Sequence, residues 1–408
     1  MNSPNIRLRR AAIVAPLRTA VGKFGGTLAP LGAGDLGAVI IKALIERSGM
    51  DPARVDDVVF AQGYGSGEAP AIGRWAWLAA GYPVSVPGYQ LDRRCGSSLQ
   101  AVIDAAMMVQ TGASDVVLAG GVESMSNVEH YTTQLRHGIK SGNIDLHDRL
   151  TRGRMMSQPI ARFGVISGMI ETAENCAKDW GITREECDAY ALRSHQRAAA
   201  AWAEDRFADE LVPVSVPQRR GDPLIFAHDE GYRAEATAET LAALRPLEGG
   251  VVTAGNASQQ NDAAAACLVV AEDKLAELGL EPMAWLHSWA VAGCEPSRMG
   301  IGPVPAVERL FARTGLDWDD IGVVELNEAF APQVLAVLKG WGWDKADGRL
   351  DMLNPNGSGI SLGHPIGATG LRILAGLCRE LQRRDARYGL ETMCIGGGQG
   401  IAAVFEKA

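Results

Sequence analysis

The chain has 408 residues and a net charge of −9, and hydrophobic and charged residues make up 47% and 21% of it. This length predicts two or three domains of a globular protein with a sizeable core. The acidic balance and the lack of any apolar run of ~18 residues argue against nucleic-acid binding, attraction to an anionic membrane and a membrane span.

The cysteines and the start of the chain indicate a compartment. There are seven cysteines, an odd number, and no two are spaced as CxxC. This argues against a disulfide framework and a metal site and favours a reducing environment. The basic start, Met1 to Arg10, precedes an apolar run, Ala11 to Pro16, that is too short for a signal peptide's core. We therefore expect a cytoplasmic protein.

The first 125 residues alternate between strand and helix patterns. Ala11 to Ala15 predicts a buried strand that Pro16 ends, and Val58 to Ala61 predicts a second strand. Between them we expect a helix that Asp35 caps and Gly49 ends. Its apolar face consists of Leu36, Val39, Ile40, Ala43 and Leu44.

The same alternation continues as far as a pair of glycines. Ser97 to Thr111 predicts a helix that ends at Gly112, and Asp115 to Ala119 predicts a strand that runs into Gly120-Gly121. The alternation indicates an α/β protein with a mostly parallel sheet covered on both faces.

The pattern changes after Met125. Residues 126 to about 170 are polar and irregular, and a helix then runs from a capping box of Thr183 and Glu186 to about Ala203. Strands and helices resume at Val251. We interpret 126–251 as an insertion that lies over the sheet.

The two ends of the chain resemble each other. Arg47-Ser48-Gly49-Met50-Asp51 precedes one strand, and Arg313-Thr314-Gly315-Leu316-Asp317 precedes another. Further on, Cys95 opens a helix before the strand that ends at Gly120-Gly121, and His364 precedes a helix and a strand that ends at Gly396-Gly397-Gly398. We predict two similar halves, with Cys95 and the His364 region facing each other across a pseudo-twofold axis.

Four segments are candidates for chemistry. Cys95-Gly96-Ser97 places a thiol at a strand-to-helix turn, where free N–H groups and the helix dipole favour a thiolate and a pKa of ~3.5–7.5. A buried core cysteine is the alternative. Asn327 in Asn327-Glu328-Ala329-Phe330 follows a strand, at the edge where open α/β sheets bind ligands, although it could simply cap the next helix.

The other two candidate segments are rich in glycine. His364 lies between Gly363 and Pro365, a context that suits an accessible ring better than a regular core element. Cys394-Ile395-Gly396-Gly397-Gly398 offers a second thiol beside N–H groups suited to an oxyanion hole. A phosphate-binding P-loop requires a lysine after its glycines, and no lysine follows here.

Together these segments favour acyl transfer. A thiol protease needs one cysteine with its histidine, so the second cysteine would be surplus. Two thiols and a histidine suit a two-stage reaction, in which one thiol holds an acyl group and the other moves a proton.

At this point the sequence resembles the thiolase family, the acetyl-CoA acetyltransferases and 3-ketoacyl-CoA thiolases, over nearly its whole length. The resemblance also rests on Arg18-Thr19-Ala20-Val21-Gly22-Lys23, Gly121-Val122-Glu123-Ser124-Met125-Ser126 and Asn256-Ala257-Ser258. It implies the thiolase fold: two similar βαβαβαββ halves in a five-layered α-β-α-β-α core with an inserted loop domain. We expect residues 1–125 and 252–280 to form the N-terminal half, 126–251 the loop domain and 281–408 the C-terminal half.

The resemblance also implies roles for the site residues. Cys95 would take the acyl group, His364 would activate it, and a water held on Asn327 would help His364 to bind the thioester oxygen. Cys394 would move the α-proton of acetyl-CoA, and the N–H groups of Cys95 and Gly396 would form a second oxyanion hole. Coenzyme A and acyl-CoA would be substrates, without a permanently bound cofactor, and the chain would form a homodimer or homotetramer.

For the substrate, the resemblance implies further contacts. Arg233 would lie against the adenine end of CoA and Ser258 against the pantetheine, and Met169, Ala329 and Phe330 would line the pocket. The chain departs from the common pattern at Gly168, where many members have histidine, at Gln259, where glycine is usual, and at Ser98, where glycine is commoner. These departures affect the expected substrate, since branched or longer acyl chains could enter, and leave the expected reaction unchanged.

Other functions within and outside this fold fit these residues less well. Decarboxylating ketoacyl synthases and hydroxymethylglutaryl-CoA synthase-like enzymes use Cys-His-His or Cys-Glu-His sets, which the second cysteine here does not match. A non-catalytic acyl-CoA or lipid carrier of the same fold would bind acyl-CoA without covalent transfer. The set Cys95, His364, Asn327 and Cys394 argues against a carrier.

Overall fold

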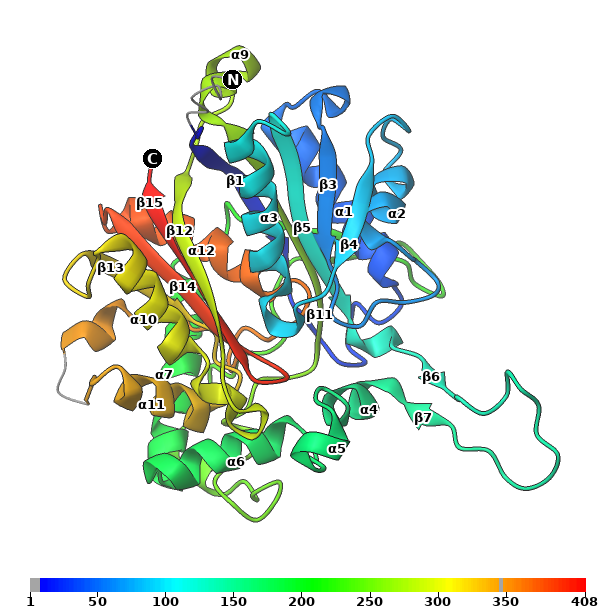
Figure 1. The fold of residues 1–408 in the computed structure, drawn as a ribbon, viewed down its shortest axis with the longest axis vertical. Helices are drawn as coiled ribbons and strands as arrows, with labels where there is room; N and C mark the ends of the chain where they lie inside the picture. The colour runs from blue at the N-terminus through cyan, green and yellow to red at the C-terminus, as the bar shows by residue number, and fades with distance from the viewer. Residues whose placement is uncertain (1–7, 345–347) are drawn as a thin grey trace, which may run out of the picture.

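The computed structural model describes residues 8–344 and 348–408, so most of the basic start, Met1 to Arg7, lies outside the described residues. Its main feature is a sheet of eleven strands within these ranges, in which nine strands follow the order β13-β14-β15-β12-β1-β11-β5-β3-β4 (Figure 1). The short strands β2 (Gly22–Lys23) and β8 (Leu211–Val212) pair with β11 and β1.

The sheet consists of two halves with the same order. In the N-terminal half, β4 and β3 are parallel to each other and β3 is parallel to β5, whereas β5, β11 and β1 are antiparallel in turn. In the C-terminal half, β13 is parallel to β14, and β14, β15 and β12 are antiparallel in turn. A parallel bridge from Val324 to Leu353 takes the place of β4. The strands are β1 (Ala11–Thr19), β3 (Asp57–Ala61), β4 (Gly88–Leu91), β5 (Val116–Ser124) and β11 (Asn261–Ala271), then β12 (Ala284–Gly293), β13 (Ile321–Leu326), β14 (Tyr388–Ile395) and β15 (Gln399–Lys407).

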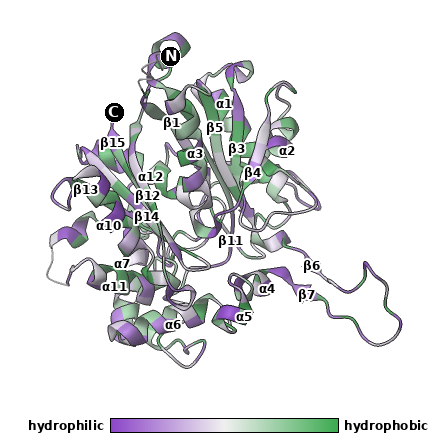
Figure 2. Ribbon diagram, in the orientation of Figure 1, coloured by the Kyte–Doolittle hydropathy of each residue, from purple (hydrophilic) through white to green (hydrophobic). Residues whose placement is uncertain are grey.

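Helices form three layers around these halves. Helices α3 (Ser97–Thr111) and α12 (Thr369–Arg383) lie between the two halves and share one buried apolar cluster with strands of both. Helices α1 (Ala33–Ser48) and α2 (Ile72–Ala79) cover the outer face of the N-terminal half. Helices α10 (Pro303–Thr314) and α11 (Ala331–Gly340) cover that of the C-terminal half. The layers are therefore α-β-α-β-α. Most residues of the central strands are apolar and buried (Figure 2).

The segment between β5 and β11 lies at one end of the sheet and carries the remaining longer helices (Figure 1). Within it, the loop that joins β6 to β7 projects away from the body as an arm. Its elements are β6 (His130–Tyr131), β7 (His147–Asp148), α4 (Arg149–Met155), α5 (Ile160–Phe163), α6 (Met169–Trp180), α7 (Arg184–Ala203), β9 (Val214–Val216), β10 (Leu224–Phe226) and α8 (Ala238–Ala242). The residue boundaries expected for the two halves and the loop domain stay a prediction.

The prediction of a mostly parallel sheet is wrong, because five of the eight pairings along the strand order are antiparallel. Two local predictions are confirmed closely and two are wrong in detail. Helix α3 spans the predicted residues, and Thr183 and Glu186 form the capping box of α7. Strand β1 does not end at Pro16, because the proline sits at a bulge where Ala15 has φ 46° and the register with β11 shifts. Asp35 does not cap α1 from outside; it is the third helical residue and accepts from the N–H of Gly32 at 3.1 Å.

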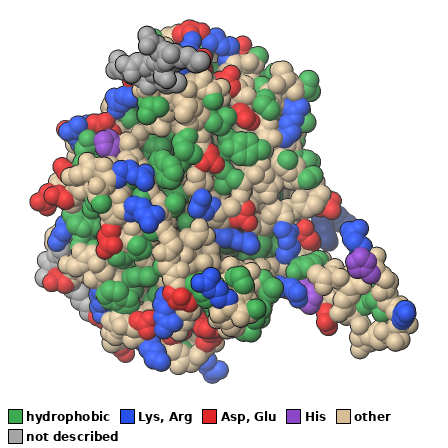
Figure 3. All heavy atoms as spheres, viewed as in Figure 1, with side chains coloured by type: hydrophobic (Ala, Val, Ile, Leu, Met, Phe, Trp, Pro, Cys, Tyr) green, Lys and Arg blue, Asp and Glu red, His purple; other side chains and the backbone are tan. Residues whose placement is uncertain are grey.

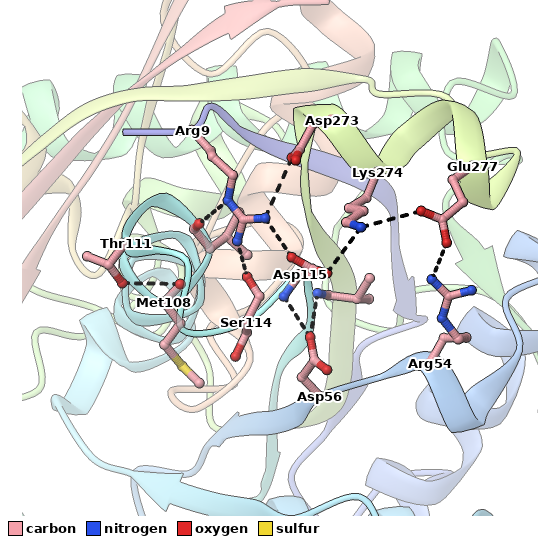
Figure 4. Close-up of polar contacts among 12 residues, drawn as sticks. Arg9, Arg54, Asp56, Met108, Thr111, Ser114, Asp115, Asp273, Lys274 and Glu277 are labelled. Carbon is pink, nitrogen blue, oxygen red and sulfur yellow. Dashed lines mark hydrogen bonds and ion pairs between the residues drawn. The ribbon is translucent and has the colours of Figure 1, made fainter. Parts of the chain in front are cut away.

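A polar network ties the start of β1 to the far end of α3 (Figure 4). Arg9 forms an ion pair with Asp115 at 2.5 Å and donates to the carbonyl oxygen of Val109 at 3.0 Å. The short helix α9 (Leu275–Leu278) joins the network, since Lys274 lies 3.6 Å from Asp115 and Glu277 pairs with Arg54 at 2.6 Å. These partly exposed contacts lie at the end of the sheet where β1 begins (Figure 1).

Candidate active site

The two central helices bring the Cys95 and His364 segments together. Cys95 lies in a single 3-10 turn, Arg94–Gly96, directly before α3, and His364 lies five residues before α12 begins. The helix starts touch: the N–H of Leu371 donates to Oγ of Ser98 at 3.0 Å, and a Cβ on Gly370 would lie 2.4 Å from the backbone nitrogen of Leu99. Ser98, one of the departures from the common pattern, therefore links the two helices.

Cys95 is buried, and its thiol is held in the protonated form. Burial raises the pKa of Cys95 to about 11. The hydrogen bond from the N–H of Gly396 and the charge of Arg94 stabilise the thiolate and oppose this rise. The prediction of a lowered pKa is therefore wrong in this structure, because loss of solvent outweighs the N–H groups. A thiol in this state needs a base to become a nucleophile.

The His364 backbone is fixed by its neighbours. Gly363 has φ 103°, and a Cβ there would lie 2.8 Å from Oδ1 of Asn261, so glycine is required at this position. The N–H of His364 donates to the same Oδ1 at 2.8 Å, and the Asn261 amide donates to the carbonyl oxygen of Gly22 at 3.0 Å. The imidazole is thereby positioned against the N-terminal half of the sheet.

Hydrogen bonds define the tautomer of His364. Nδ1 lies 2.7 Å from Oγ1 of Thr369, and that hydroxyl donates its proton to the carbonyl oxygen of Pro365 at 2.9 Å. The hydroxyl must then accept from Nδ1–H, which leaves the lone pair on Nε2. Burial, followed by the charges of Arg372 and Arg154, lowers the pKa of His364 to about 3. The ring is neutral near pH 7 and can accept a proton at Nε2.

Asn327 contacts His364, and Cys394 lies near Cys95. Asn327 follows β13, and its Nδ2 lies 3.4 Å and 3.5 Å from the ring nitrogens of His364. Its Oδ1 is buried without a hydrogen-bond partner among the described residues. Cys394 is the penultimate residue of β14 and is fully buried, and burial raises its pKa well above the ordinary value, with the neighbouring Cys95 acting in the same direction.

A cavity of 360 Å³ opens onto these groups, a size suited to a small-molecule site. Cys95, His364 and Gly396 line it, whereas Asn327 and Cys394 do not. Apolar side chains make up much of the wall. They are Met125, Met169, Ile170, Leu247, Ala257, Met299, Ala329, Phe330 and Ile366.

Most of the residues expected to contact the substrate reach this cavity. Met169, Ser258, Ala329 and Phe330 line it, as do the two departures Gly168 and Gln259. The N–H of Ser258 donates to the carbonyl oxygen of Ala329 at 2.9 Å, which joins two parts of the wall. A Cβ on Gly168 would meet nothing within 4 Å, so the absent histidine leaves open space.

Arg233 is the predicted site residue that lies apart. It is exposed and does not line the cavity, and its N–H donates to Nδ1 of the buried His195 at 3.2 Å. Its loop is nevertheless connected to the wall, because Nε2 of Gln259 donates to the carbonyl oxygen of Gly231 at 2.9 Å. Arg233 therefore lies two residues after Gly231, the residue that contacts Gln259 of the cavity wall.

Comparison with known proteins decides the family. Residues 11–273 match the family model described as "Thiolase, N-terminal domain", and residues 280–407 match "Thiolase, C-terminal domain". The chain belongs to the thiolase family. An acetyl-CoA acetyltransferase of Chromobacterium violaceum is 47% identical over 401 residues, covering 97% of this thiolase and 99% of the relative. The acetyl-CoA acetyltransferase of Escherichia coli is 43% identical and covers 98% of this chain and 100% of its own.

Solved structures agree with this assignment. An acetyl-CoA acetyltransferase of Bacillus anthracis has a TM-score of 0.93 at 39% identity, covering 99% of this thiolase and all of the other chain. Human mitochondrial 3-ketoacyl-CoA thiolase in complex with CoA has a TM-score of 0.91 at 37% identity, covering 98% and 99%. The predicted thiolase fold and the enzyme class, an acyltransferase of the thiolase type, are confirmed, and neither the carrier nor the ketoacyl synthase alternative is favoured.

Some cavity residues of this thiolase were missed from the sequence. Tyr64, Arg154 and Gln260 line the wall. Gln260 follows the Asn256-Ala257-Ser258 motif, and that adjacency was a usable signal. Tyr64 follows a strand but stands in no motif, and Arg154 lies in the irregular segment, so only the tertiary structure brings them to Cys95.

Proposed function

We propose that this thiolase transfers an acyl group between CoA and acetyl-CoA through a thioester on Cys95. The observation that carries the proposal is the pairing, at one cavity, of a protonated thiol with a neutral histidine whose Nε2 carries the lone pair that can accept its proton. The Cys95 sulfur then attacks the carbonyl carbon of an acyl-CoA, and CoA leaves as a thiol after taking the proton back from His364.

The second stage makes or breaks the carbon–carbon bond. In thiolysis, acyl transfer from the 3-keto carbon to Cys95 breaks the bond to C2, and the acetyl-CoA enolate takes a proton from Cys394. Condensation runs the same steps in reverse. A thiol whose pKa burial holds high is protonated at rest, which suits it to protonate the enolate. The N–H groups of Cys95 and Gly396 would stabilise the negative charge on the acyl oxygen, and His364 with a water on Asn327 would do so for the CoA thioester.

CoA is the substrate that the proposal places over the loop segment. The pantetheine would pass Ser258 and Gln259 and reach Cys95 between Met169, Ala329 and Phe330, and the adenine end would lie near Arg233. The hydrogen bond from Gln259 to Gly231 supports this path, because it links the cavity wall to the Arg233 loop.

We also infer that copies of the chain assemble. The arm between β6 and β7 projects into solvent (Figure 3), although it carries four exposed large apolar side chains. These are Leu135, Ile139, Ile144 and Leu146. Exposed apolar side chains on a projecting segment favour contact with another protein surface. We propose a dimer or tetramer, and a cytoplasmic location.

No helix within residues 8–344 and 348–408 is long and apolar enough to cross a membrane.

The proposal predicts an acyl-enzyme that mass spectrometry can detect. After brief incubation with acetyl-CoA or acetoacetyl-CoA, intact protein is expected to carry one acetyl group, peptide mapping is expected to place it on Cys95, and added CoA is expected to remove it. Absence of an adduct with every acyl-CoA donor, despite measurable CoA binding, would favour a carrier instead.

Substitution of Cys394 is expected to separate the two stages. Cys394→Ser should keep acylation of Cys95 by acetyl-CoA but lower condensation and thiolysis of a 3-ketoacyl-CoA by about 10²- to 10⁴-fold, the range of a lost acid–base group. Acylation is followed by mass spectrometry and the second stage by release of acetyl-CoA.

Cys294→Ser is the matched control, since Cys294 is a half-buried cysteine that does not line the cavity. It should leave both stages nearly unchanged. Equal loss of acylation and thiolysis in Cys394→Ser would contradict the division of roles between the two cysteines.

A further inference from the structure

Two arginines line the cavity beside the reactive cysteine, although its wall is otherwise largely apolar. Arg94 precedes Cys95 in the chain, whereas Arg154 comes from α4 in the loop segment. Acetyl transfer needs no cation in the acyl pocket, because the acetyl group carries no charge. The two guanidinium groups therefore call for a separate explanation.

Arg154 differs from the other arginines around it. Arg94 pairs with Asp92 at 3.7 Å and donates to the carbonyl oxygen of Gly63 at 2.7 Å. On the same helix as Arg154, Arg149 pairs with Glu129 at 2.9 Å and Arg152 contacts His147 at 2.9 Å. Arg154 forms no ion pair with any carboxylate in the described part of the chain.

Neutral groups hold the Arg154 side chain in place. With the Gln260 amide oriented so that its oxygen faces the guanidinium, that oxygen accepts from Nη2 at 3.0 Å and from Nη1 at 3.1 Å. The second neutral group is Tyr64: burial raises the pKa of Tyr64, and the charge and hydrogen bonding of Arg154 oppose that rise. Arg154 is half-buried, so its charge is positioned while it lacks a counter-ion.

Arg154 also lies close to the reacting groups. Its charge is one of the causes that lower the pKa of His364. In CoA thioesters the pantetheine arm separates the phosphates from the acyl group, so an arginine near His364 is out of their reach. Among the described residues that line the cavity, the one carboxylate is Glu248, which is exposed and belongs to a segment held against α6 through Glu174. Arg154 is held instead by Gln260 and Tyr64, and its contacts include no carboxylate among the described residues.

There is also room for an acyl group larger than acetyl. The space at Gly168 is open, as described above, and a second hollow begins at Tyr64, Arg94 and Gly153, which line both spaces. A chain that starts at Cys95 can therefore extend toward Arg154.

We propose that the acyl group transferred to Cys95 ends in a carboxylate and that Arg154 binds this carboxylate. The substrates would be CoA monothioesters of dicarboxylic acids, in the 3-oxo form for thiolysis. A guanidinium binds a carboxylate with two charge-assisted hydrogen bonds, which are strongest where solvent is partly excluded. The inference rests on the proposed acyl transfer and specifies its substrate.

Matched pairs of donors test the inference on the wild-type enzyme. Succinyl-, glutaryl- and adipyl-CoA are compared with butanoyl-, pentanoyl- and hexanoyl-CoA of the same carbon number, and the rate of acylation of Cys95 is followed by intact-protein mass spectrometry. At least one dicarboxylic donor is expected to react roughly 10- to 100-fold faster than its neutral counterpart, as expected for a hydrogen bond between charged groups.

Variants then assign the preference to Arg154. Arg154→Met keeps the length of the side chain and is expected to abolish the preference, measured as the ratio of the acylation rates with each dicarboxylic donor and its neutral counterpart. Arg154→Lys is expected to restore part of this ratio. Arg152→Met, on the same helix and outside the cavity, is expected to keep the preference.

The contrary outcomes are distinct. If neutral donors react as fast as dicarboxylic ones in the wild type, the inference is wrong and the proposed acyl transfer stands. If Arg154→Met slows both kinds of donor equally, Arg154 acts on CoA or the thioester and the inference is again wrong. If no donor acylates Cys95, the proposed function itself fails.

Discussion

Cys95→Ala is expected to abolish turnover, by at least about 10⁴-fold, and to leave CoA affinity nearly unchanged. The reason is that the substitution removes the sulfur that carries the acyl group and little else. The turn before α3 does not depend on the thiol, because Oγ of Ser97 accepts from the N–H of Arg93 at 2.8 Å and the helix begins at Ser97. Cys95 lines the cavity, so truncation enlarges a space that is already present.

Steady-state thiolysis of acetoacetyl-CoA measures the first effect and titration calorimetry with CoA measures the second. Cys294→Ala serves as control, since it removes a half-buried thiol outside the cavity wall. It should keep both turnover and affinity. Parallel loss of turnover and CoA affinity in Cys95→Ala would mean that Cys95 is structural, and retained turnover would mean that another group is the nucleophile.

Local signals allowed parts of the fold to be predicted to the residue. Helix α3 and the cap of α7 follow from a C-terminal glycine and a Thr-Glu pair, both of which act within one turn. The end of β1 could not be predicted in this way. Pro16 is tolerated because β1 bulges against β11, and a bulge depends on a partner strand about 250 residues away in the sequence.

The candidate site shows the same division. Cys95, His364 and Cys394 could be found because each stands among glycines that a regular core element does not need. The protonation state of Cys95 could not, since burial by residues distant in sequence raises its pKa to about 11. Arg154 was missed for a related reason: its segment has no periodic pattern, and its position beside Tyr64 and Gln260 exists only in the folded chain.

Arg18, which the sequence marked only as part of a family motif, is expected to be central to stability. It is 1% exposed and holds two carboxylates of the loop segment, with Nε 2.6 Å from Oε1 of Glu210 and Nη1 2.8 Å from Oδ1 of Asp229. Burial acts to lower the pKa of Arg18, but Asp229 and Glu210 together raise it. Arg18→Met would leave two buried carboxylates without their cation, so we expect it to lower the free energy of unfolding by about 3–5 kcal/mol.

Urea denaturation followed by circular dichroism measures this loss, and Arg54→Met is the matched control. Arg54 also pairs with a carboxylate at 2.6 Å, but both partners are about half exposed (Figure 4), so the control is expected to leave the midpoint nearly unchanged. Equal midpoints for the two variants would contradict a stabilising role for the buried group. A loss of stability in Arg18→Met alone would mean that the charge of Arg18 holds the loop segment against β1. Asp229 also accepts from the N–H of Val21 at 2.7 Å and lies four residues before Arg233. The same contact would then support the surface on which we place CoA.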